Sequence, residues 1–340
     1  MATAKIIIDG DGTAALCCAH LLQRSSIPFS LKPHTPGKQP AILLGSQAIS
    51  LLKDVSQARH LLDAGWQIER RVVQWGNARE PRLIPHYAVS ISEEALLAGM
   101  RASLAHGPED SQGNADWRIV TRRSNSADAF DVFGRRQAIS QRVVLKRSED
   151  SRNCWVESTP HGWLFLLPFS ENEASLITSG YEPTRVIEES RLVVPRLSSE
   201  LSLTGAVSIA PKIARMLHQD KMILTGSAAM RFDPLCGEGA GHAVREAYLT
   251  VAVIRAALRG VTVDDLLDHY SRRLRQAFLR HLVICSSFYS SGGGSDFWHE
   301  EEESLQKGIG ELQSQIEDSS PVQFCFNGLD LEAIAPQLAL

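Results

Sequence analysis

No CxxC pair occurs in this chain of 340 residues, and its six cysteines are spread along the sequence. That spacing favours neither a zinc site nor a disulfide framework. No apolar run approaches the length of a membrane span, and no basic segment with a long apolar core opens the chain. We therefore expect no membrane segment, no signal peptide and a reduced, cytoplasmic protein. Cys17 and Cys18 stand in an apolar helical run, which favours burial.

Neither sign of charge is in large excess, because 35 basic and 39 acidic residues give a formal net charge of −4. The basic residues are scattered rather than gathered in a stripe, so the sequence predicts no nucleic-acid partner. Charged residues make up 22% and hydrophobic residues 44% of the chain, as in an ordinary globular protein. At this length the chain can hold one large domain or two intertwined domains.

The most informative stretch runs from Ile223 to Ala247. A short apolar run at 222–224 predicts a strand end, and apolar spacing predicts a helix from about Ala240 to Gly260. Between them lie a Gly-Ser pair, an Asp-Pro turn and a glycine cluster: Gly226, Ser227, Asp233, Pro234, Gly237, Gly239 and Gly241. A strand, a glycine-rich loop and a helix start bring backbone N–H groups close to an anionic or polar ligand.

A second glycine-rich loop lies at the N-terminus. Residues 5–8 predict a buried strand, residues 10–15 read GDGTAA, and a helix is predicted to continue to Gln23. In a GxGxxA loop the first glycine allows a tight turn, the second admits a pyrophosphate, and the small third residue lets helix and strand pack. This context predicts a dinucleotide site. An acid that binds the adenosine ribose is expected after the next strand, but the chain has Lys32, Pro33 and His34 there.

Residues 226–247 read GSAAMRFDPLCGEGAGHAVREA and resemble the C-terminal flavin motif of FAD-dependent monooxygenases and flavin-dependent halogenases, the p-hydroxybenzoate hydroxylase-like group. Residues 131–140 resemble the Asp-Ala-Thr-Gly-Arg segment of the same families. The resemblance implies an α/β fold with a Rossmann-like FAD-binding domain, an inserted antiparallel β-sheet substrate domain and C-terminal helices. The implied boundaries are 1–70, 90–140 and 215–260 for the FAD-binding domain, 71–89 and 150–214 for the substrate sheet, and 261–340 for the helical region.

The resemblance also implies FAD as the cofactor. The residues implied to hold it are Gly10, Gly12, Thr13, Ala14, Ala15, Gly226, Ser227, Pro234, Gly237, Gly239, Ala240 and Gly241. Ser227 stands where the family has the aspartate of a Gly-Asp pair that binds the ribityl chain, and a serine is a weaker acceptor than a carboxylate. Since the ribose acid is missing too, a loosely bound FAD or a non-catalytic binding or scaffold protein stays an alternative.

The implied chemistry is transfer of an oxygen atom from a flavin C4a-hydroperoxide to an electron-rich, aromatic substrate. That substrate is either a small molecule or a side chain of a peptide presented by a partner protein. The cofactor performs this reaction, and the protein positions the substrate and excludes water. We therefore predict no catalytic acid or base.

Four residues are candidates for the substrate side: Trp75, His86, Trp163 and Phe165. Residues 163–168 partly match the Trp-x-Trp-x-Ile-Pro signature of flavin-dependent halogenases, with Phe165 in place of the second tryptophan. Halogenation is therefore a further alternative, although it needs a lysine between flavin and substrate, and neither Lys38 nor Lys53 can be placed there from the sequence. An edge strand with aromatic core residues explains the same pattern without a substrate.

Local patterns predict further elements. Ser90 with Glu93 forms a capping box for a helix over about 92–105. The charged residues 142–153 predict a shortened or mobile connection. Residues 154–158 and 162–168 predict a hairpin, and residues 183–203 predict one or two helices interrupted by Pro195.

Overall fold

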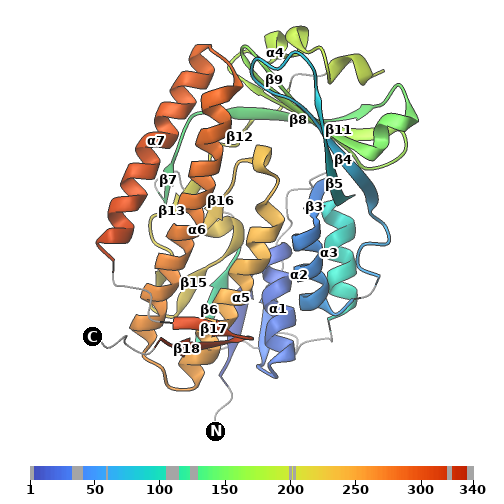
Figure 1. Cartoon of the computed structure of the whole chain (residues 1–340). Helices are drawn as coiled ribbons and strands as arrows, with labels where there is room; N and C mark the ends of the chain where they lie inside the picture. Colours follow the sequence, from blue (N-terminus) through green and yellow to red (C-terminus); the bar gives the residue numbers. More distant parts are fainter. Residues whose placement is uncertain are drawn as a thin grey trace.

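The computed structural model describes residues 4–32, 41–58, 60–104, 115–122, 129–198, 201, 204–319 and 324–334. Its two main sheets lie at different ends of the molecule, and long helices run along one side (Figure 1). In the described ranges, no helix is both long and apolar enough to cross a membrane.

The smaller sheet has five strands in the order β14-β15-β6-β1-β2. Its parallel strands are β1 (Ile6–Asp9), β2 (Phe29–Lys32), β6 (Trp117–Val120) and β15 (Met222–Leu224), and β14 (His218–Gln219) pairs antiparallel at the edge. Helices α1 (Thr13–Arg24) and α5 (Gly239–Leu258) pack against each other beside this sheet, in the lower half of Figure 1. Because β1 and β15 run in the same direction, the two glycine-rich loops that follow them leave the same edge of the sheet.

The larger sheet has eight strands in the order β12-β8-β11-β10-β9-β4-β5-β3. The strands are β3 (Ile42–Gly45), β4 (Trp66–Gln74), β5 (Arg82–Ile91), β8 (Gln137–Val144), β9 (Asn153–Thr159), β10 (Gly162–Pro168), β11 (Glu173–Gly180) and β12 (Val207–Ser208). Neighbouring strands are antiparallel except β4 and β9, which are parallel. The predicted hairpin of β9 and β10 is confirmed, but β10 lies in the middle of the sheet and not at its edge.

The remaining elements connect and cover these sheets. Helices α2 (Ser46–Ser56) and α3 (Glu93–Ala102) lie near α1, and α4 (Pro183–Glu189) packs on β11. The strands β7 (Phe130–Val132), β13 (Lys212–Ala214) and β16 (Met230–Arg231) form a small antiparallel sheet. Helices α6 (Val263–Gly292) and α7 (Asp296–Glu317) pack along each other, and the hairpin β17 (Phe324–Asn327) and β18 (Asp330–Ala333) follows (Figure 1).

Alternate side chains of β10 pack into two different hydrophobic cores. Trp163 and Phe165 pack into the core shared with α5 and α6, whereas Leu164 and Leu166 pack into a second core with α4. Both faces of this strand are therefore buried, as expected for a central strand.

The structure corrects three local predictions, in whole or in part. The cap of α3 is Ser92, whose hydroxyl accepts from the Ala95 N–H at 3.1 Å. Ser90 lies in β5, where it pairs with Leu43 of β3 and Trp66 of β4. Residues 142–153 form the end of β8, the 3₁₀ helix η2 (Ser148–Arg152) and the start of β9, so they are an ordered connection. Within the described part of 183–203, the helical elements are α4 and the short 3₁₀ helix η3 (Val194–Arg196).

The segment after α4 is held by a buried acid rather than by helical hydrogen bonds. Glu157 of β9 accepts hydrogen bonds from the N–H groups of Arg191, Leu192 and Val193 at 2.7–2.9 Å. Because these N–H groups point at a side chain, they do not form the ladder of a continuous helix.

Candidate functional site

The N-terminal loop has one glycine that its backbone requires and one that faces open space. Gly10 has φ +139°, and a Cβ there would lie 2.1 Å from the Thr121 hydroxyl oxygen. Gly12 is the N-cap of α1, and a Cβ there would have no neighbour within 4 Å among the described residues. The first turn of α1 has no side-chain cap, so its N–H groups are open to an anionic ligand.

Acidic residues of this loop are held by arginines that the sequence analysis did not single out. Asp9, which is buried at the end of β1, pairs with Arg122 at 3.1 Å. Asp11 pairs with Arg101 of α3 at 2.6 Å. The pairs neutralise two carboxylates beside a predicted pyrophosphate site, where unpaired negative charge would repel the ligand.

The second glycine-rich loop touches the first. Gly226 has φ +63°, and a Cβ there would lie 2.6 Å from the Cβ of Ala14. The Gly226 N–H donates to the buried Glu246 carboxyl group at 2.7 Å. The half-buried Ser227 hydroxyl donates to the Thr121 carbonyl oxygen at 3.3 Å. Two loops that are more than 200 positions apart in the chain therefore lie directly against each other.

The loop continues through the Asp-Pro turn to the start of α5. Asp233 caps the 3₁₀ helix η5 (Pro234–Cys236), because its carboxylate accepts from the Leu235 N–H at 2.9 Å. Gly237 follows in the left-handed region at φ +67°. A Cβ on Gly239 would meet nothing within 4 Å, and one on Gly241 would make ordinary contacts with Arg245 and Ala48, so Gly239 faces open space as Gly12 does.

A buried network holds Asp233 in place. The guanidinium of Arg136 donates to Asp233 at 2.7 Å and also to Glu301 of α7, and all three side chains are buried. The Tyr289 hydroxyl donates to the same Asp233 carboxylate at 2.9 Å and accepts from the Trp163 indole N–H at 3.0 Å. The network thus links the second glycine-rich loop to the larger sheet and to the two long helices α6 and α7.

The four substrate-side candidates occupy different environments. Trp163 is fully buried and Phe165 is 6% exposed, so both belong to the core in this structure. Trp75 is half-buried, donates to the Phe288 carbonyl oxygen at 3.1 Å, and packs edge-on against Phe288 and Trp298. Their roles toward a substrate stay predictions.

His86 lies beside Arg71, a residue that sequence reasoning missed. Burial and, to a lesser degree, the Arg71 charge lower the pKa of His86, so its imidazole is neutral at neutral pH. Among the described residues, Nε2 of His86 and Nε of Arg71 are buried without a hydrogen-bond partner. A Cβ on Gly237 would lie 3.5 Å from Nη2 of Arg71, so the guanidinium faces the second loop. Unpaired buried polar atoms at this junction fit a polar ligand.

The residues fit FAD better at the pyrophosphate end than at the ribose and ribityl positions. Gly12 and Gly239 leave open space, and Gly10 and Gly226 adopt backbone conformations that favour glycine. Lys32 is exposed at the end of β2, while Pro33 and His34 lie outside the described residues. Nothing in the sequence pattern distinguished Arg71 or Glu246 from other charged residues, since their roles depend on contacts between distant elements.

Comparisons with known proteins agree on this fold. Residues 136–283 match a family described as an FAD binding domain. A tryptophan 2-halogenase from Chondromyces crocatus is 26% identical over 165 residues, which are 42% of this chain but only 31% of that protein. The match therefore spans less than a third of that relative's length.

Two solved structures are similar over most of the chain. The flavin-dependent halogenase CmlS has a TM-score of 0.73 at 16% identity, covering 93% of this chain and 72% of its own. The peptidyl tryptophan dihydroxylase QhpG, essential for tryptophylquinone cofactor biogenesis, has a TM-score of 0.72 at 16% identity, covering 98% and 86%. These similarities confirm the predicted fold class.

Proposed function

We propose that this chain, which has the fold of the FAD-dependent monooxygenases and flavin-dependent halogenases and matches their FAD binding domain, is an oxidoreductase that oxygenates an electron-rich aromatic group. The family match indicates FAD as the cofactor. The observation that carries the proposal is the joining of the two glycine-rich loops, where Gly226 lies against Ala14 and Gly12 and Gly239 leave space. The aromatic group belongs to a small molecule or to a tryptophan of a peptide.

The binding residues have separate tasks in this proposal. The N–H groups at the start of α1 would bind the pyrophosphate, and Ser227 with the loop from Pro234 to Gly241 would hold the flavin. When bound and reduced, FAD supplies the activated oxygen. The protein fixes the loop through Arg136 and Asp233 and keeps water from the site with the aromatic core around Trp163.

Arg71 and His86 are the proposed polar contacts at the junction of the second loop and the larger sheet. Arg71 presents a planar guanidinium whose polar groups are all donors, so it can stabilise negative charge on the flavin or bind a carboxylate of the substrate. Neutral His86 can accept or donate one hydrogen bond and can hold the ring of the substrate in place. Neither residue is required as a proton-transfer catalyst.

Oxygenation is favoured over halogenation by the residues of the larger sheet. The resemblance implies that halogenation needs a lysine between flavin and substrate. None of the eight strands, from β3 to β12, contains a lysine in its described range, and Lys53 is exposed on α2. Lys38 lies outside the described residues. Arg71 faces the second loop at Gly237, and a planar guanidinium does not replace the compact ammonium group of a lysine.

The test supplies chemically reduced FAD to the purified protein and then mixes it with oxygen. Free tryptophan and a tryptophan-containing peptide serve as substrates, each with and without bromide. We expect mass spectrometry to show products that gain one or two oxygen atoms whether or not bromide is present, and Arg71→Met to reduce their yield. Products that carry bromine and form only with bromide would contradict the proposal.

A further inference from the structure

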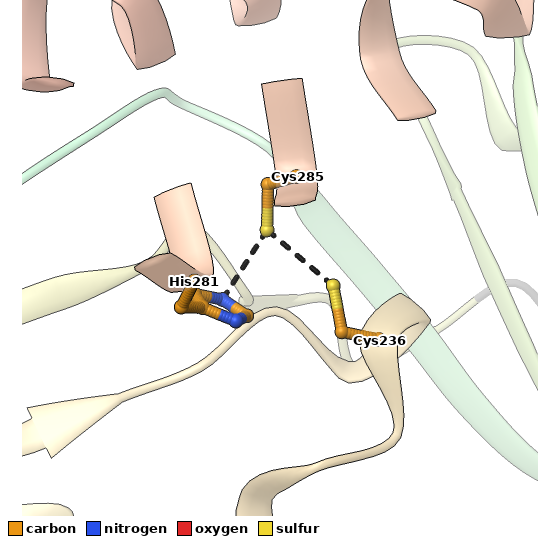
Figure 2. Close-up of side chains that lie close together, drawn as sticks. All are labelled: Cys236, His281 and Cys285. Atoms are coloured by element: carbon orange, nitrogen blue, oxygen red, sulfur yellow. Dashed lines mark hydrogen bonds between the residues drawn. The ribbon is translucent and has the colours of Figure 1, made fainter. Parts of the chain in front are cut away.

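Three side chains with no assigned task in the proposed function lie together where the second loop meets α6. Cys236 precedes Gly237, while His281 and Cys285 are four residues apart on α6 and therefore share one face of that helix (Figure 2). The Sγ atoms of Cys236 and Cys285 are 3.6 Å apart, and Sγ of Cys285 is 3.2 Å from Nε2 of His281. Cys236 is half-buried and Cys285 is buried behind it.

The hydrogen bonds of His281 argue against a metal ion in this cluster. Its Nε2 already accepts the Asp233 backbone N–H at 2.9 Å. A metal-ligating histidine normally donates its other ring N–H to a carboxylate, carbonyl or water, but Nδ1 of His281 is buried without a partner among the described residues. The cluster also offers three donors, one fewer than a closed structural zinc site.

We propose that Cys236 and Cys285 are a redox-active dithiol that reacts with hydrogen peroxide and closes to a disulfide. The Cys236 thiol attacks peroxide, which gives a sulfenic acid and one water. The sulfur of Cys285 then attacks the sulfenic sulfur, the S–O bond breaks, and the hydroxyl group leaves with the Cys285 hydrogen as a second water. The two thiols together lose two electrons, and the peroxide gains them.

The positions of the side chains assign these roles. Cys236 is the more accessible thiol and meets peroxide first. Burial raises the pKa of the Cys285 thiol well above its usual value, so Cys285 keeps its proton at neutral pH and acts second. Burial also lowers the pKa of His281 to about 4, and its neutral imidazole, which the Asp233 N–H fixes through Nε2, lies 3.2 Å from Sγ of Cys285 and holds that sulfur beside Cys236. His281 is therefore a positioning residue.

The location next to Gly237 suggests where the peroxide comes from. If the proposed function is correct, reduced flavin that meets oxygen without a substrate releases peroxide beside Cys236. This source rests on the proposed function, whereas the reactivity of the thiols toward added peroxide does not. The disulfide would join the second loop to α6 and would consume peroxide at its point of release.

The test uses the full chain without FAD, so its outcome is independent of flavin chemistry. Hydrogen peroxide is added, free thiols are alkylated, and peptides are mapped by mass spectrometry. We expect a linked peptide pair containing Cys236 and Cys285, formed before the exposed Cys325 is oxidised and reversed by dithiothreitol. Cys285→Ser should lose the linked pair and accumulate a sulfenic acid on Cys236 that dimedone traps.

Two further variants test whether His281 positions Cys285 and whether loss of another buried cysteine has the same effect. His281→Gln should slow formation of the linked pair and raise dimedone trapping at Cys236, because the sulfenic acid waits longer for Cys285, and Cys154→Ser should behave as wild type. Three results would overturn the proposal: Cys236 oxidised to a sulfinic acid while Cys285 stays a free thiol, Cys236 unreacted after Cys325 is oxidised, or stoichiometric zinc on the purified protein that protects both thiols until a chelator removes it.

Discussion

Glu246 is buried on α5, where it accepts the Gly226 N–H. Burial raises its pKa to about 8, although the hydrogen bond from Gly226 acts in the opposite direction. The folded protein therefore holds a proton that the unfolded chain releases at the ordinary glutamate pKa. The stabilising contribution of protonated Glu246 is full below about pH 4.3 and is lost as pH rises to about 8.

Glu246→Gln should remove this pH dependence, because a glutamine keeps a carbonyl acceptor for Gly226 and does not titrate. We expect the stability difference, wild type minus variant, to fall as pH rises from 5 to 8, by at most about 1.4 kcal/mol per pH unit. Urea unfolding of both proteins at several pH values measures it. A constant difference over this range would show that Glu246 is already ionised at pH 5.

Ser227 tests the ribityl side of the site. Ser227→Asp should tighten FAD binding by about 1 kcal/mol, because a carboxylate is a stronger acceptor for a ribityl hydroxyl and part of the gain is lost to its desolvation. Ser227→Ala serves as the control, and its effect should be small because the serine hydroxyl donates to Thr121. Calorimetric titration with FAD gives both values. A folded aspartate variant with unchanged or weaker binding would place the ribityl chain elsewhere.

Among single residues, the sequence predicts those whose role depends on neighbours in the chain. It does not predict those whose role depends on contacts with distant elements. The glycines at 10 and 226 could be predicted because their spacing follows a strand and precedes a turn or helix. Glu246 and Arg71 could not, since the role of Glu246 depends on burial against Gly226 and that of Arg71 on its position facing Gly237 from the larger sheet. Burial of Cys17 and Cys18 was predicted from their apolar surroundings and is confirmed.

The loop between β1 and α1 can be tested as an element by a matched pair of glycine substitutions. Gly10→Ala should destabilise the fold by about 1–3 kcal/mol, because φ +139° disfavours a side chain and its Cβ would overlap Thr121. Gly12→Ala should change stability by no more than about 0.5 kcal/mol, because its φ of −87° is ordinary and its Cβ meets open space. Denaturant unfolding compares them, and equal losses would contradict the described loop.

Most elements could be predicted from apolar periodicity, and the errors have physical causes. The spacing from Ser90 to Glu93 fits a capping box, but β5 continues through Ser90 and leaves Ser92 as the cap. The helices predicted over 183–203 are cut short because Glu157 takes three N–H groups of that segment. In both cases a contact with a distant strand outweighs a local pattern.

For the whole molecule, the pair Arg136 and Asp233 joins parts that are far apart in the chain. Arg136→Met should cost about 3–5 kcal/mol, because it leaves the buried carboxylates of Asp233 and Glu301 without the cation that they share. Arg135→Met is the matched control, since the Arg135 side chain is exposed and pairs with the half-exposed Glu300, and its effect should be small. Thermal unfolding measures both, and similar losses would contradict a central role for the network.

The overall fold followed from the resemblance of two separated motifs rather than from composition. The hairpin of β17 and β18 and the packing of α6 on α7 carry no motif and were not predicted. The cluster of Cys236, His281 and Cys285 was also missed, because cysteine spacing in the sequence cannot show that α6 lies behind the second loop. Contacts of this kind depend on the tertiary arrangement.

The central claim is that the loops at Gly10–Ala15 and Gly226–Gly241 together bind FAD. Titration of the purified, FAD-free protein with FAD, followed by flavin fluorescence, tests it most directly. We expect saturable binding of one FAD per chain, weak enough that the protein is purified pale or colourless, because two acidic contacts of the family are absent. Gly12→Val should abolish that binding while circular dichroism and the unfolding midpoint stay close to wild type. No binding by the wild type at millimolar FAD, or unchanged affinity in a folded Gly12→Val variant, would contradict the account.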